Sequence, residues 1–183
     1  MDIAKQRASI RGLNNITWMH TSLLDLPSLD IGKFDYINCS GVLHHLESPQ
    51  EGLAALNSVL KQDGAILIMV YAKYGRTAIY QIQELMRRIN KDESDLNVQV
   101  DNCRTILESL PESNWYQHSR PAFPDEETKK SIELFDLFLH SQDRAYSVSE
   151  LYEYVEDEGL TVLRLLPSRS HYGNALYNPE TYI

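Results

Sequence analysis

The sequence predicts an α/β fold with a parallel sheet, and three neighbouring segments carry this prediction. Residues 34–39 can form a buried strand, a capped helix follows Ser48, and the apolar run 65–71 can form a second strand. Strand, helix and strand over about forty residues form a βαβ unit with a right-handed crossover. Ligands of such sheets bind beyond the carboxyl ends of the strands, here beside Ser40 and Gly41.

The composition indicates one ordinary domain. The chain has 183 residues, 43% of them hydrophobic, and its 17 basic and 26 acidic residues leave a net charge of −9. This charge repels phosphate backbones and anionic membranes, so we expect neither nucleic acid nor a membrane as a partner. Cys39 and Cys103 have no metal-ligand spacing, and we expect no metal site. Free thiols and the absence of a signal peptide favour a cytoplasmic protein.

The first residues predict a helix and a strand. Residues 3–11 have helical periodicity, and Gly12 supplies the left-handed position that closes a helix. The β-branched and aromatic run 16–20 predicts a short strand.

Two start signals precede the next helix. Ser48 and Glu51 form a capping box, and Pro49 occupies the first helical position. We expect this helix to end at Gly64, with an inward stripe of Leu53, Leu56, Val59 and Leu60.

Helical periodicity then dominates as far as residue 146. An amphipathic helix is predicted over 78–89, and Asp101 is expected to cap a further helix that Pro111 ends. After a loop over 111–124, another helix carries Ile132, Phe135, Phe138 and Leu139.

The last part returns to the sheet. Ser147 and Glu150 form a second capping box, and residues 160–166 are expected to form a strand. We therefore interpret 77–146 as a helical insertion that covers substrate, between core segments 1–76 and 147–183.

Three segments resemble class I S-adenosylmethionine-dependent methyltransferases. Residues 35–45 (DYINCSGVLHH) match the family's fourth strand and its loop, 60–65 (LKQDGA) the turn into the fifth, and 22–27 (SLLDLP) the loop after the third. The resemblance implies a Rossmann-like sheet, S-adenosylmethionine as cofactor, and methyl transfer to an acceptor that we expect to be a small molecule.

The resemblance also implies roles for the matching positions. Ser22 and Leu23 would meet the adenine ring. Ser40, Gly41 and Val42 would lie beside the methionine part of the cofactor, with Leu43, His44 and His45 near the transferred methyl group.

The family's glycine-rich loop and its ribose-binding acid have no counterpart in the sequence. The predicted sheet therefore lacks its first two strands, and the segment after 160–166 is short for the family's last strand. Three alternatives follow: a truncated portion of a longer methyltransferase, direct pairing of 16–20 with 34–39, or another chain that fills the gap.

Whether this chain is itself an enzyme stays open. A second hypothesis is a non-catalytic, partner-binding module that self-associates through unpaired sheet edges.

Adjacent histidines follow the central strand. His44 or His45 is the candidate base for the acceptor, because histidine titrates in the required range. In the alternative interpretation, one ring packs beneath the loop and the other bonds a backbone carbonyl.

Tyr71, Tyr74 and Arg76 follow the second strand of the unit and are candidate substrate residues, Arg76 being suited to a carboxylate or phosphate. Alternatively, Tyr71 packs and Arg76 is solvated. Near the end of the insertion, His140 either belongs to a closing cap or pairs with Asp136 on the surface.

Overall fold

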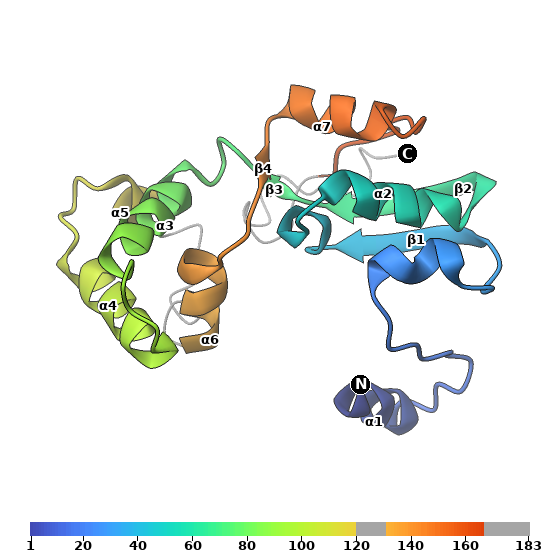
Figure 1. Ribbon diagram of the computed structural model, residues 1–183, viewed down its shortest axis with the longest axis horizontal. Coiled ribbons are helices and arrows are strands. Elements are labelled where there is room, and N and C mark those ends of the chain that lie inside the picture. Colours follow the sequence, from blue (N-terminus) through green and yellow to red (C-terminus); the bar gives the residue numbers. More distant parts are fainter. Residues whose placement is uncertain (120–130, 167–183) are drawn as a thin grey trace, which may run out of the picture.

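The computed structural model describes residues 1–119 and 131–166. It confirms the α/β class (Figure 1): a small parallel sheet packs with helices on one side of the molecule, and a group of helices forms the other side. None of the described helices is long and apolar enough to cross a membrane.

The predicted βαβ unit is present. Strands β1 (Phe34–Ser40) and β2 (Leu60–Met69) pair in parallel, and α2 (Pro49–Ser58) connects them. The backbone N–H of Glu51 donates to Ser48 Oγ at 3.3 Å, as expected for the cap.

The helix does not run to Gly64 as expected, because β2 already begins at Leu60. Leu60 pairs with Phe34 of β1, and the N–H of Phe34 donates to Val59 O at 2.8 Å. Val59 and Leu60 are thus buried at the start of the strand rather than on a helix face. Apolar spacing alone cannot distinguish these two environments.

Two expected strands are absent from the described residues: 16–20 and 160–166 both have irregular backbone. A strand needs a neighbour for its backbone hydrogen bonds, and in the described structure β1 and β2 pair only with each other. The alternative of direct pairing between 16–20 and β1 is therefore wrong. Leu160 and Val162 still pack against the sheet side of the molecule. The remainder of the expected core segment, 167–183, lies outside the described residues.

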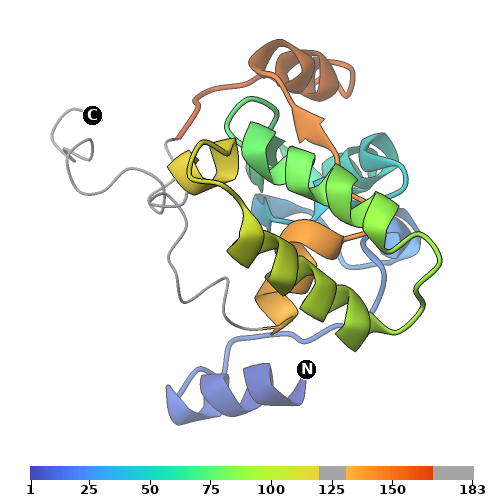
Figure 2. The same ribbon diagram turned by 90° about the vertical axis from the view of Figure 1, so that its left-hand side faces the viewer.

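The predicted helices are present with shifted boundaries. Gly12 has φ +65° just after α1, as expected of a left-handed closing position. The cap of the second insertion helix is Asp95 instead of Asp101, because Asp95 Oδ1 accepts from the N–H of Asn97 at 2.8 Å. Besides α7 (Val148–Glu156) and two short 3-10 helices, the described helices outside the βαβ unit are α1 (Asp2–Ile10), α3 (Thr77–Ile89), α4 (Leu96–Ser109), α5 (Trp115–Ser119), α6 (Ser131–Leu134) and the π-helical η4 (Phe135–Leu139). Figure 2 views the molecule from the side on which α3, α4, α5 and α6 lie.

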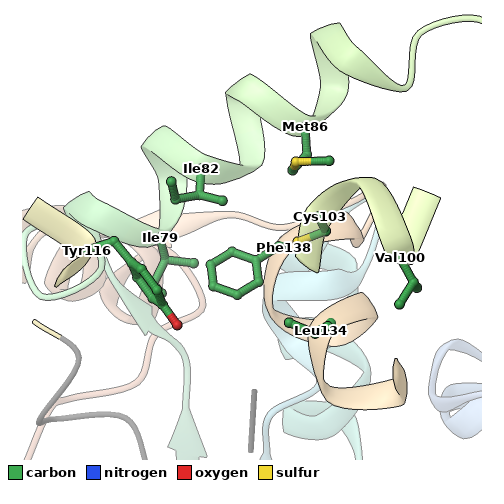
Figure 3. Packing of buried hydrophobic residues seen from close by; sticks show 8 residues of the cluster. All are labelled: Ile79, Ile82, Met86, Val100, Cys103, Tyr116, Leu134 and Phe138. Atoms are coloured by element: carbon green, nitrogen blue, oxygen red, sulfur yellow. The ribbon is translucent and has the colours of Figure 1, made fainter. Parts of the chain in front are cut away.

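Within the described residues, buried apolar side chains form two clusters. One lies among the helices α3 to η4 and is shown in Figure 3; its members are Ile79, Ile82, Met86, Val100, Cys103, Tyr116, Leu134 and Phe138. The other joins the sheet to α2 and to α7 (Val148–Glu156); its members are Cys39, Leu43, Leu53, Leu56, Tyr146, Tyr154 and Val155.

A short strand pair lies at the junction between these parts. Strands β3 (Tyr71–Ala72) and β4 (Ala145–Tyr146) pair in parallel, so the chain leaves for the helices and returns at neighbouring points. The predicted capping box of Ser147 and Glu150 then starts α7. The N–H of Glu150 donates to Ser147 Oγ, and the N–H of Ser147 donates to Glu150 Oε2.

Candidate functional site

A groove of about 610 Å³ opens where β1 ends. It brings together Ser22, Leu23, Ser40 and Val42 from the predicted cofactor set, although nearly twenty residues separate the first pair from the second. The hollow therefore reaches from the end of β1 to the segment that begins η1 (Leu23–Ser28). Its full lining is Thr21, Ser22, Leu23, Leu26, Asn38, Cys39, Ser40, Val42 and Leu56.

Local hydrogen bonds hold the polar side chains of this groove. Ser22 starts η1 as a capping residue: its Oγ accepts from Leu24 N at 3.2 Å, and its own N–H donates to Asp25 Oδ2 at 3.3 Å. Ser40 Oγ donates to Asn38 Oδ1 at 2.7 Å. The groove thus combines fixed hydroxyl groups with leucine and valine side chains.

Gly41 and Leu43 do not line the groove and belong to the turn that follows β1. Gly41 has φ +75°, a conformation that favours glycine, and its N–H donates to Met69 O at 3.1 Å. Leu43 is fully buried against α2 at Gly52, where an added Cβ would overlap Leu46 and lie 2.9 Å from Leu43 Cδ2. The absence of a side chain at Gly52 lets the turn after β1 lie directly on α2.

The turn η2 (Leu43–His45) carries the predicted histidines next to the groove. The His44 ring centroid lies 3.9 Å from that of Tyr71, and Arg76 Cζ lies 3.6 Å from the same Tyr71 centroid. Two planar groups cannot both lie so close to one ring face. Tyr71 is therefore held between the His44 imidazole and the Arg76 guanidinium.

His44 is fully buried, and neither of its ring nitrogens has a hydrogen-bond partner within the described residues. Burial, followed by the nearby His45, lowers the pKa of His44 from 6.5 to about 4. Arg76 is not solvated as the alternative interpretation supposed, since its Nε and Nη2 are buried and unpartnered. Tyr74 is 78% exposed, apart from this stack.

His45 contacts the chain that returns from the insertion. Its Nδ1 lies 2.9 Å from Gln142 O, and its ring centroid lies 4.1 Å from that of His140. The N–H of Gln142 donates to His140 Nδ1 at 3.2 Å. The positions of His44 and His45 match the packing interpretation, and a catalytic role for either stays a prediction.

A polar anchor fixes the same returning segment on α3. Asp143 accepts from Tyr80 Oη at 3.0 Å and from Gln83 Nε2 at 3.2 Å, and Gln83 Nε2 also donates to Leu137 O. Sequence reasoning missed Tyr80, Gln83 and Gln142, because no local motif marks a contact between segments so far apart.

Within 1–119 and 131–166, no group of three or more metal-ligating side chains converges.

Known proteins share this architecture. PKMT2 from Rickettsia typhi, solved in complex with AdoHcy, matches with a TM-score of 0.61 and 22% identity over 86% of this chain and 32% of its own. A second structure of PKMT2 matches with a TM-score of 0.56 and 23% identity over 86% of this chain and 30% of its own. These likenesses show that the chain shares the fold of PKMT2.

Sequence comparisons agree with the fold. Residues 1–66 match a family model described as a methyltransferase domain. An uncharacterized protein of Synechococcus sp. is 36% identical over 163 residues, which are 88% of this chain and 39% of that protein. The chain thus spans well under half the length of this relative. The resemblance to class I S-adenosylmethionine-dependent methyltransferases is confirmed.

Proposed function

We propose that the chain belongs to an S-adenosylmethionine-dependent methyltransferase, with an incomplete Rossmann-like sheet, and that it takes part in methyl transfer to a small-molecule acceptor. One observation carries the proposal: the groove at the end of β1 joins Ser22 and Leu23 to Ser40 and Val42, the positions at which the family resemblance places the cofactor. PKMT2, which shares the fold, was solved with AdoHcy, the product left after methyl transfer.

The groove lining suits an adenosyl sulfonium compound. Leu23, Leu26 and Val42 offer apolar surface for a flat ring, while Ser22 and Ser40 offer hydroxyl groups for polar atoms. When bound, the cofactor supplies the electrophilic methyl group. The chain's own part is to bind and orient the two reactants, and proximity of this kind contributes up to roughly 7–11 kcal/mol to lowering a barrier.

We further propose that residues 77–146 cover the acceptor and that Tyr71, Tyr74 and Arg76 contact it. The positions of Tyr71 and Arg76 support a contact with the acceptor, because both residues lie next to η2 where the helices join the sheet. His45 is the better candidate base of the adjacent pair, since His44 is fully enclosed while His45 is only partly buried.

Calorimetric titration with AdoHcy tests the proposal. We expect the chain to bind AdoHcy, and Ser40→Tyr to weaken binding by at least about tenfold, ~1.4 kcal/mol, because the larger side chain fills the groove. Ser9→Tyr, at an exposed position on α1, is the matched control and should bind like the wild type. A complete lack of AdoHcy binding by the wild-type chain would refute the proposal.

A second candidate function, a partner-binding module that self-associates, is favoured by the exposed residues of β1. Phe34 and Tyr36 are 42% and 58% exposed, and in the described structure β1 pairs on one side only. We expect size-exclusion chromatography with light scattering to show a dimer that Tyr36→Lys converts to a monomer, because a charge on a strand edge opposes pairing. A strictly monomeric wild-type chain that binds AdoHcy would remove this candidate.

A further inference from the structure

The backbone of Gln142 determines which nitrogen carries the proton in two neighbouring histidines. A carbonyl oxygen can only accept, so His45 Nδ1, at 2.9 Å from Gln142 O, must be the protonated nitrogen. The N–H of Gln142 can only donate, so His140 Nδ1 must be unprotonated. In their neutral forms, His45 therefore has a free lone pair on Nε2, whereas His140 has an N–H at Nε2.

The two rings lie together with these Nε2 atoms available. Their centroids are 4.1 Å apart, and the ring planes are inclined by 33°. Both side chains are only partly buried, and within the described residues no hydrogen bond engages either Nε2. A polar atom that is not hydrogen-bonded is either enclosed or open to solvent, and neither Nε2 atom is enclosed. Both are therefore accessible at the surface. The two adjacent rings thus carry one available acceptor and one available donor.

We infer that His45 and His140 form a binding site for a hydroxyl group of the methyl acceptor, an assignment that rests on the proposed function. The hydroxyl donates to His45 Nε2 and accepts from His140 Nε2–H, and a hydroxyl is a group that can do both. A protonated amine has no lone pair with which to accept the second bond. The pair therefore selects an alcohol or a phenol over a protonated amine, and the insertion contributes His140 to this recognition.

Long-range ¹H–¹⁵N correlation spectra of the full chain at slightly alkaline pH test the tautomers directly. We expect His45 to have its proton on Nδ1 and His140 to have its proton on Nε2, with resonances assigned through His45→Asn and His140→Phe. Finding His45 with its proton on Nε2 would overturn the inference. This readout needs no cofactor, so it is independent of whether AdoHcy binds.

Titration with phenol, and with anisole as the matched probe without a hydroxyl proton, tests the hydroxyl site. Phenol should move the ¹⁵N resonance of His45 Nε2 upfield, and anisole should leave it unchanged. His140→Phe keeps a stacked ring but lacks the donor, and it should weaken phenol binding by about three- to tenfold. His118→Phe, at an exposed histidine on α5, should have no effect. Equal responses to phenol and anisole, or no response to either, would contradict the site.

Discussion

Phe138→Ala is expected to lower the free energy of unfolding by about 3–5 kcal/mol. Phe138 is 1% exposed and lies at the centre of the helical cluster, with its ring edge-on to Tyr116 at a centroid distance of 5.4 Å. Its side chain is surrounded by residues from α3, α4, α5 and α6 (Figure 3). Removing it both loses apolar burial and leaves a cavity that rigid helices can only partly fill.

Urea unfolding followed by circular dichroism measures this loss. Ile132→Ala is the matched control, because Ile132 is also a large apolar residue of the same segment but is 75% exposed. It should change stability by less than about 0.5 kcal/mol. A loss below about 1 kcal/mol in Phe138→Ala would mean that the helical cluster does not stabilise the folded chain as its burial indicates.

Acidification from pH 7.5 to pH 5 is expected to destabilise the chain by about 2 kcal/mol through His44 alone. The pKa of His44 is about 4 in the folded chain, below its ordinary value of 6.5. Between these values the unfolded chain binds a proton that folded His44 does not. The stabilisation is therefore complete above about pH 6.5 and is lost as the pH falls towards 4.

His44→Phe separates this contribution from those of other titrating groups. The phenyl ring keeps the stack on Tyr71 but cannot bind a proton, so the difference in stability between pH 7.5 and pH 5 should shrink by about 2 kcal/mol. His20→Phe, at an exposed position, should leave that difference unchanged. An unaltered pH dependence in His44→Phe would mean that the buried ring is protonated at no cost.

Local signals in the sequence predict most of the elements. Ser48 with Pro49, and Ser147 with Glu150, mark helix starts that the structure confirms, because capping bonds depend on residues only a few positions apart. Asp95, directly before Leu96, carries the same capping signal as Asp101, so the sequence alone does not decide which of the two starts the helix.

Prediction fails where a distant partner decides the outcome. Residues 160–166 have strand composition, yet in the described structure no neighbouring strand supplies hydrogen bonds to them. In the site, Ser22 and Ser40 could be placed together because strand ends meet at one edge of a sheet. The contact of His45 with Gln142 joins residues separated by 97 positions and has no signature in either segment.

The parallel pairing of β3 with β4 has a consequence for how this molecule can change over evolution. Because the polypeptide departs and re-enters at one place, the helices between Ala72 and Ala145 can lengthen, shorten or be exchanged without moving the groove beside β1. The residues at this junction, among them Tyr71, Gln142 and Tyr146, must keep their contacts. A new acceptor could thus be accommodated by remodelling the distal helices alone.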